Sequence, residues 1–391
     1  MAQAIISRRG GGSGYATITF NGVYALNTKN VTVLNESVGS LAATSIGNYA
    51  VFAGGTTNGI NYSSSVTAYN SGLSKETPNN LSSARRGLAA TTVGNYALFG
   101  GGNNGNSLST VDAYNRFLTQ STPTSLSVSR SHLAATSVGT YALFGGGESG
   151  TNCFSTVDAY NTSLTRSTPT SLSGARSHLA ATTVGNYALF GGGYNSSSPY
   201  YKSTVDAYNT SLARTTPTAL SVARDYLAAT TVGNYALFGG GDNDTYSSTV
   251  DAYNTSLTRT TPTALSVARY NLAATTVGDY ALFGGGNNTT YLSTVDAYNT
   301  SLIRSTERNL NVTRSQLAAT TVGDYALFGG GFNSNGTYFV NSYNVNNKVT
   351  VYPGKYKLGS MASESTAYTM LEIETTAPIT GYIKIKDATI N

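Results

Sequence analysis

The feature that most constrains this chain is an internal repeat. The string Leu-Ala-Ala-Thr occurs seven times at intervals of 45 to 48 residues. Each copy continues through a Gly-x-Tyr step and a short apolar stretch into glycine, as in LAATTVGNYALFGGG at 88–102. A period of this size indicates repeated supersecondary units that stack on one another. The copies begin at Leu41, Leu88, Leu133, Leu179, Leu227, Leu272 and Leu317.

Within one copy the pattern is that of short β-strands. In the segment 110–115 (TVDAYN), side chains alternate with a period of two, as they do along a pleated strand. LAATTV and YALF are short apolar or β-branched runs separated by a glycine, and no segment has the apolar spacing of a helix. Four such strands in about 45 residues match one propeller blade. The sequence therefore predicts an all-β fold with seven blades.

The order of Arg, LAATTVGNYALFGGG and VDAYN resembles the kelch repeat over residues 41–345. In that family an arginine precedes the inner strand, a glycine doublet closes the second strand and an aromatic residue closes the third. The resemblance implies a seven-bladed kelch-like β-propeller. Kelch repeats usually carry a tryptophan after the tyrosine, and this chain has none, so we expect tyrosine and phenylalanine to pack between blades. The matching arginines are Arg85, Arg130, Arg176, Arg224, Arg269 and Arg314, and the matching tyrosines are Tyr69, Tyr114, Tyr160, Tyr208, Tyr253, Tyr298 and Tyr343.

The residues outside the repeats suggest a small β extension from the chain termini. We divide the chain into an N-terminal leader with a candidate strand (1–29), the propeller (30–348) and a C-terminal β extension (349–391) that could either cap one blade or attach the protein to a partner. Segments 368–375 and 381–388 alternate like strands, and 15–20 could pair with them. Either 30–38 (NVTVLNESV) or 348–352 (KVTVY) could complete the seventh blade, and we favour the N-terminal segment.

Composition excludes several classes of protein. Only 10% of the residues are charged, and the net charge of +5 is spread without a basic cluster, so nucleic acid is not an expected partner. No apolar run reaches 18 residues, which argues against insertion into a membrane. The single cysteine excludes an intramolecular disulfide and a cysteine-based zinc site. No ordinary secretion signal is visible at the N-terminus, so we expect synthesis in a host cytoplasm.

The sequence offers few groups of residues that could form a catalytic site. His132 and His178 occupy equivalent repeat positions, and with no third histidine or nearby acidic motif we expect polar residues at a strand start rather than metal ligands. The aspartate of VDAYN recurs in five copies, so we expect it to pair with the recurring arginine rather than to act in acid-base catalysis. We predict no catalytic residue, no metal ion and no cofactor. These aspartates are Asp112, Asp158, Asp206, Asp251 and Asp296.

The copies differ from one another mainly in two places. One is the loop after the glycines, for example 194–202 (YNSSSPYYK), and the other is the residue pair between the arginine and the leucine, for example Asp225-Tyr226. In a four-stranded meander both connections lie on the same face, and loops on a rigid scaffold are common recognition sites. Their tyrosines and small polar residues suit glycans or protein surfaces. The predicted ligand-binding residues are Tyr62, Phe154, Tyr194, Tyr200, Tyr201, Tyr226, Tyr246, Tyr270, Tyr291, Phe332 and Tyr338.

The N-terminal segment 1–14 (MAQAIISRRGGGSG) resembles the leader of tail-associated proteins from phages and prophages of Gram-positive bacteria. The resemblance implies a structural, receptor-binding component of a virion or phage tail, located at the particle surface. Its expected partners are a cell-surface glycan or protein and, through the termini, other virion or tail proteins. Two alternatives are a carbohydrate-active kelch-type enzyme and an intracellular kelch adaptor.

Overall fold

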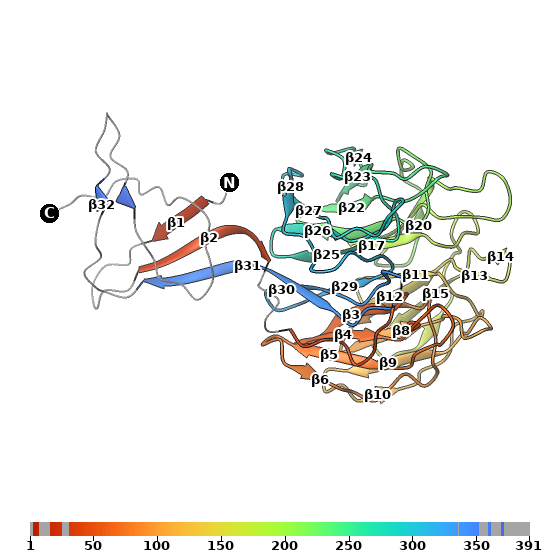
Figure 1. Ribbon diagram of the computed structural model, residues 1–391. Coiled ribbons are helices and arrows are strands. Elements are labelled where there is room, and N and C mark those ends of the chain that lie inside the picture. The colour runs from red at the N-terminus through yellow and green to blue at the C-terminus, as the bar shows by residue number, and fades with distance from the viewer. Residues whose placement is uncertain are drawn as a thin grey trace.

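The computed structural model describes residues 3–7, 16–25, 31–334, 336–351, 359–360 and 369–370 (Figure 1). Every regular element among them is a β-strand. Seven antiparallel sheets follow one another around a central axis and form the blades of a β-propeller. The all-β, seven-bladed fold predicted from the repeat is confirmed. The described part of the chain has no helix with the length and apolar character needed to cross a membrane.

Blades one to six are four-stranded meanders in which the chain runs from the axis outwards. The innermost strands are β3 (Ala42–Ile46), β7 (Ala89–Val93), β11 (Ala134–Val138), β17 (Ala180–Val184), β21 (Ala228–Val232) and β25 (Ala273–Val277). The second strands are β4 (Tyr49–Ala53), β8 (Tyr96–Gly100), β12 (Tyr141–Gly145), β18 (Tyr187–Gly191), β22 (Tyr235–Gly239) and β26 (Tyr280–Gly284). The third strands are β5 (Val66–Asn70), β9 (Val111–Asn115), β15 (Val157–Asn161), β19 (Val205–Asn209), β23 (Val250–Asn254) and β27 (Val295–Asn299). The outermost strands are β6 (Lys75–Glu76), β10 (Gln120–Ser121), β16 (Arg166–Ser167), β20 (Arg214–Thr215), β24 (Arg259–Thr260) and β28 (Arg304–Glu307).

The seventh blade combines the two ends of the repeat region. Its inner strands are β29 (Ala318–Val322), β30 (Tyr325–Gly329) and β31 (Val340–Val351), and its outer strand is the N-terminal β2 (Ala16–Ala25), which pairs with β31. β1 (Gln3–Ser7) pairs with the other edge of β2. Because a distant N-terminal segment supplies the outer strand, the chain closes the ring by strand pairing.

The prediction that 30–38 forms this closing strand is wrong, although the strand does come from the N-terminal side. Leu34 N–H donates to Tyr338 O at 2.8 Å, and Val38 N–H donates to Thr337 O at 3.1 Å. At the boundary between blades one and two, the N–H groups of Leu81 and Arg85 donate in the same way to the carbonyl oxygens of Ser64 and Ser63. Residues 31–38 are therefore the connection from blade seven to blade one, because they make the bonds that the other connections make.

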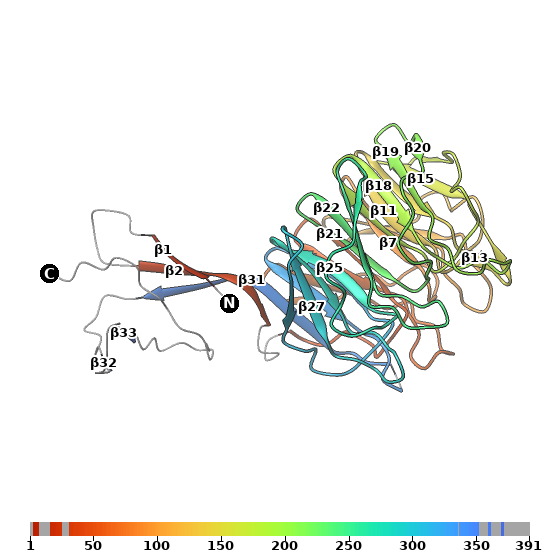
Figure 2. The same ribbon diagram turned by 90° about the horizontal axis from the view of Figure 1, so that it is seen from above.

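The β2–β31 ribbon leaves the propeller on the face opposite to the loops that follow the glycines. β31 starts at Val340 beside Gly329, runs to Asn344 beside Tyr325 at the far face, and continues outwards to Val351 paired with Ala16. Figure 2 shows the ribbon projecting away from the blades. The predicted boundary at 348/349 falls within this strand. Segment 15–20 lies largely in β2 and pairs with β1 and β31. Of segment 368–375 only β33 (Thr369–Met370) is described, paired with β32 (Gly359–Ser360), and 381–388 lies outside the described residues.

Phenylalanine and tyrosine pack between the blades, as expected from the missing tryptophan. In blade four the rings of Phe190 and Tyr208 meet edge to face with centroids 5.9 Å apart, and the Tyr208 hydroxyl donates to Thr170 O in the preceding connection at 2.8 Å. The Phe190 ring also lies against Gly145 of blade three, where an added Cβ would come within 2.8 Å of it. Glycine at this position therefore lets neighbouring blades approach closely.

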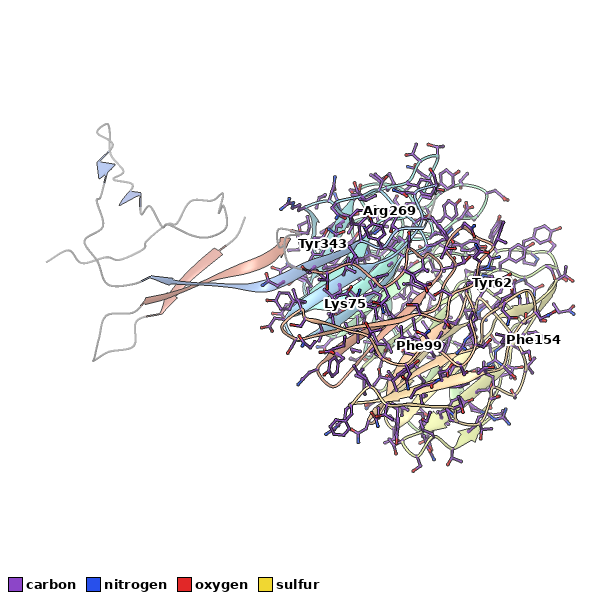
Figure 3. All side chains as sticks on the ribbon, turned by 60° about the horizontal axis from the view of Figure 1, so that its bottom comes forward. Tyr62, Lys75, Phe99, Phe154, Arg269 and Tyr343 are labelled. Atoms are coloured by element: carbon purple, nitrogen blue, oxygen red, sulfur yellow. The ribbon has the colours of Figure 1, made fainter. Side chains whose placement is uncertain are left out.

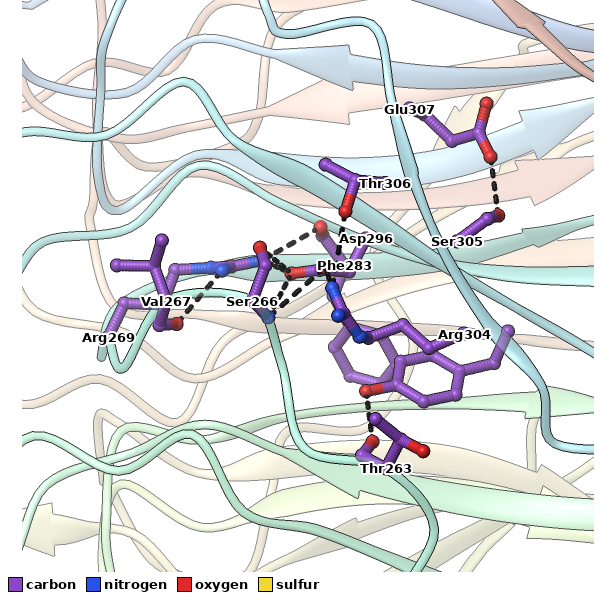
Figure 4. Close-up of polar contacts among 11 residues, drawn as sticks. Thr263, Ser266, Val267, Arg269, Phe283, Asp296, Arg304, Ser305, Thr306 and Glu307 are labelled. Atoms are coloured by element: carbon purple, nitrogen blue, oxygen red, sulfur yellow. Dashed lines mark hydrogen bonds and ion pairs between the residues drawn. The ribbon is translucent and has the colours of Figure 1, made fainter.

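The predicted arginine–aspartate pairing is confirmed in blades two to six. Arg269 Nη2 lies 2.9 Å from Asp296 Oδ2, and both side chains are fully buried (Figure 4). Ser266 donates to the same carboxylate through its backbone N–H and its hydroxyl, and Arg304 Nη1 lies 2.8 Å from Asp296 Oδ1. Such a buried carboxylate is retained because its lone pairs are satisfied by several donors. The other pairs are Arg85–Asp112, Arg130–Asp158, Arg176–Asp206 and Arg224–Asp251.

Candidate functional site

A closed ring of backbone hydrogen bonds surrounds the propeller axis at the start of the innermost strands. One residue per blade donates its N–H to the carbonyl of the equivalent residue in the preceding blade, at 2.8–3.1 Å, and the last bond runs from Ser40 to Gln316. Each of the seven has a φ of 49–62°, in the left-handed region. We call these residues the central ring, and they are Ser40, Gly87, His132, His178, Tyr226, Asn271 and Gln316. Their backbone is uniform while their side chains differ.

A second contact brings the variable loops up to the central ring. In each blade the residue before the ring residue forms an antiparallel bridge with the first residue after the glycines, as Asp225 does with Asp242 and Ser177 with Tyr194. Their backbone groups exchange hydrogen bonds of 2.8–3.0 Å. The prediction that both variable zones meet on one side of the disc is confirmed. We call this side the variable face, and Figure 3 shows Tyr62 and Phe154 on it, away from the β2–β31 ribbon.

Five aromatic side chains on the variable face, two histidines and three tyrosines, form a continuous row, which we call the aromatic row. His132 stacks on His178 with centroids 4.3 Å apart, and His178 lies 4.2 Å from Tyr226. Tyr226 contacts Tyr270 at 6.0 Å, and Tyr270 stacks on Tyr246 at 5.5 Å with nearly parallel planes. The row follows the central ring from His132 in blade three to Tyr226 in blade five, then continues through Tyr270 of blade six to Tyr246 in the loop of blade five. Tyr246 is 40% exposed, so the row ends on an accessible aromatic surface.

A carboxylate that the sequence did not place there lies beside the two histidines. Glu148 Oε1 is 2.9 Å from His132 Nδ1 and 3.9 Å from His178 Nε2, and Ser177 Oγ donates to Glu148 Oε2 at 2.8 Å. The expectation that no acidic group is near these histidines is therefore wrong. Burial raises the pKa of Glu148, but the hydrogen bond from His132, the neighbouring His178 and the bond from Ser177 outweigh it and lower the pKa. The three side chains form the one group of potential metal ligands among the described residues.

A second acidic group surrounds the middle of the row. Asp225 is buried directly before Tyr226, and burial together with the charge of Asp242 raises the pKa of its carboxyl to about 7. Asp244 accepts a hydrogen bond from the Tyr201 hydroxyl at 2.7 Å. Asp225 therefore keeps its proton to a higher pH than an ordinary aspartate does.

The structure gathers some of the predicted ligand-binding residues and leaves others apart. Tyr226, Tyr246 and Tyr270 belong to the aromatic row, and Tyr194 packs against Tyr200 and Tyr201 at 6.1 and 6.0 Å. Tyr62 lies 6.0 Å from the Arg86 guanidinium, and the Phe332 ring covers Gly39. Phe154, Tyr291 and Tyr338 lie in the loops of blades three, six and seven and, within the described residues, make no ring contact with these groups. His132, Glu148, His178 and Asp225 were missing from the predicted set.

Comparisons with known proteins agree with the fold. No family model matches the sequence, and no curated protein matches it. Among solved structures, the chain is similar to the one described as "Structure of YjhT", with a TM-score of 0.55 and 11% sequence identity. The match covers 68% of this chain and 97% of that chain. At this identity the likeness shows the fold alone, and the chain is a seven-bladed β-propeller.

Proposed function

We propose that this protein is a non-enzymatic recognition module that binds a cell-surface glycan through the variable face. The observation that carries the proposal is the concentration of variable side chains on one face of an otherwise repetitive scaffold. The backbone of the central ring is the same in all seven blades, while its side chains range from glycine to tyrosine. A rigid frame that displays different side chains at equivalent places is the arrangement expected of a binding surface.

The chemistry of the face supports a glycan as the ligand. Tyr246 offers an accessible ring stacked on Tyr270, and Asn243, Asp242 and Asp244 lie on the same short loop. Sugar rings stack their C–H faces on aromatic side chains, carboxylates accept hydrogen bonds from sugar hydroxyls, and amides both accept from them and donate to them. Low charge over the whole chain favours a neutral ligand over a highly charged one.

We further propose that the protein is a kelch-like component of a phage or prophage virion, attached through its terminal strands. The N-terminal leader resemblance motivates this context. The direction of β31 supports it, because the β2–β31 ribbon leaves opposite to the variable face. A partner bound at the ribbon would thus leave the recognition face free.

A glycan array with the purified full-length protein tests the binding proposal. Tyr246→Ala should weaken binding to the selected glycan at least tenfold, because it removes the accessible end of the aromatic row. Phe117→Ala is the matched control, since Phe117 is 80% exposed and follows β9 on the opposite face. Equal binding by wild type and Tyr246→Ala would contradict the assigned surface. Reproducible turnover of the glycan would contradict the non-enzymatic role.

The virion context needs a separate experiment. Immunogold electron microscopy of particles released by lysis should place the chain at the particle surface. A particle fraction free of the chain would contradict the proposed attachment and leave the glycan result unaffected.

A further inference from the structure

We infer that His132, Glu148 and His178 form a binding site for a divalent transition-metal ion, with Zn²⁺ as the best match. One donor atom from each residue lies within 4.8 Å of the other two. Two imidazoles and one carboxylate are a donor set that suits Zn²⁺, and three protein ligands leave a coordination position for water or an external ligand. The site lies on the variable face and includes two central-ring residues, and the inference does not rest on the proposed glycan binding.

Hydrogen bonding around Glu148 determines which nitrogen of His178 carries its proton. A carboxylate only accepts, so Ser177 Oγ uses its proton in the 2.8 Å bond to Glu148 Oε2. The same oxygen lies 3.0 Å from His178 Nδ1 and must accept there, which makes Nδ1–H the donor. His178 Nε2 therefore presents a lone pair, in the way that a second contact commonly orients a metal-binding histidine.

The lone pair of His178 Nε2 faces another acceptor. Glu148 Oε1 lies 3.9 Å away, and the His178 side chain is only 10% exposed. Two acceptors cannot hydrogen-bond to each other, whereas a cation between Nε2 and Oε1 can accept a lone pair from both.

His132 supplies the third donor and the access route. Its Nδ1 lies 2.9 Å from Glu148 Oε1, and its side chain is one-third exposed. In the metal-free protein Nδ1–H donates to the carboxylate, and metal binding replaces this proton, which passes to solvent. The two imidazole planes differ by only 25°, so metal binding requires the rings to turn about their side-chain bonds to direct both lone pairs at one ion. The backbone of both residues is held by central-ring hydrogen bonds of 2.8 and 2.9 Å.

The repeat supplies variants that the fold already tolerates. The central-ring position of His132 and His178 is occupied by Asn271 in blade six, and the bridge position of Glu148 is occupied by Asn287 there. His132→Asn, His178→Asn and Glu148→Asn therefore remove a metal ligand while keeping a side chain that suits the local backbone. Cys153→Ser is the control for thiol binding, because Cys153 Sγ lies 3.8 Å from Ser177 Oγ.

The test is a titration of the full-length, tag-free protein with Zn²⁺ in competition with a chromophoric chelator. We expect one Zn²⁺ per chain, at least tenfold weaker binding in each of the three donor variants, and unchanged binding in Cys153→Ser. The bound Co²⁺ form should show visible d–d bands without a sulfur charge-transfer band. Less than one equivalent in the wild type, undiminished binding in the donor variants, or loss of binding in Cys153→Ser would each overturn the assignment.

Discussion

The Arg314 guanidinium donates to Asn341 Oδ1 at 2.8 Å, at the place where blades two to six pair the arginine with an aspartate. Arg314 is fully buried, and burial lowers its pKa to about 10. An amide compensates a buried positive charge less than a carboxylate does. In blade one neither position is charged, because Val38 stands at the arginine position and Thr67 at the aspartate position. The charged pair is thus lost on both sides of the seam where the ring closes.

Restoring the carboxylate in blade seven should stabilise the propeller. We expect Asn341→Asp to raise the free energy of unfolding by about 1–2 kcal/mol, the usual gain when a neutral hydrogen bond to a charged group becomes an ionic one. The reverse change in blade four, Asp206→Asn, should lower it by a similar amount. Urea denaturation followed by tyrosine fluorescence measures both. A fall in stability in Asn341→Asp would show that the seam does not accommodate the charge.

Removal of the closing strand should open the ring. A chain lacking residues 1–25 loses β2, so the outer edge of β31 has unpaired N–H and C=O groups that can pair with another chain. We expect a lower thermal midpoint and self-association, measured by calorimetry and by light scattering after size exclusion. A chain lacking only residues 1–7 keeps β2 and should keep the wild-type oligomeric state and nearly the wild-type midpoint. Equal behaviour of the two deletions would contradict closure by β2.

The raised pKa of Asp225 should make stability depend on pH. Its carboxyl has a pKa of about 7 in the folded protein, compared with about 4 when unfolded, so the folded state binds the proton more tightly. Stability from this group is present below pH 4 and is lost as pH rises towards 7. Asp225→Asn should therefore be more stable than wild type at pH 8, by up to about 4 kcal/mol.

At pH 5 the two proteins should differ much less. Thermal midpoints of wild type and Asp225→Asn at pH 5 and pH 8 give the comparison. The same difference at both values would mean that Asp225 does not titrate in this range.

The left-handed backbone of the central ring should restrict which residues it accepts. Asn271 has a φ of 53°, a conformation that asparagine and glycine adopt more readily than β-branched residues. Asn271→Gly should leave stability nearly unchanged, because Gly87 already occupies the equivalent position. Asn271→Val should cost about 1–2 kcal/mol. Equal thermal midpoints for the two variants would argue against strain at this position.

Local pattern was sufficient to predict the blades. Strands such as β17, β18 and β19 pair with their neighbours in sequence, so the number and order of strands follow from one copy of the repeat. The Arg–Asp pairing was also predictable, because both residues recur together. The strand that closes the ring was not predictable in this way, because β2 pairs with a strand more than 300 residues away. In addition, segment 30–38 has a strand-like sequence although it is a connecting segment.

The His132–Glu148–His178 cluster could be predicted only with knowledge of how the loops pair with the central ring. Glu148 is 16 residues from His132 and 30 from His178, and nothing in a linear motif joins them. The position of Glu148 in the repeat was a usable signal for this contact. Glu148 is the first residue after the glycines, and in every blade that residue bridges to the residue before the central-ring residue. With that rule, the sequence alone would place a carboxylate beside both histidines.

The paired bridge between Ser177 and Tyr194, which has a counterpart in every blade, makes the loops interchangeable units. Each loop of six to nine residues begins at such a bridge, and the scaffold on either side is nearly identical from copy to copy. A loop can therefore be exchanged between blades without altering the strands that carry it. The length and the side chains of each loop can therefore change independently of the others, while folding depends on the template that all seven copies share.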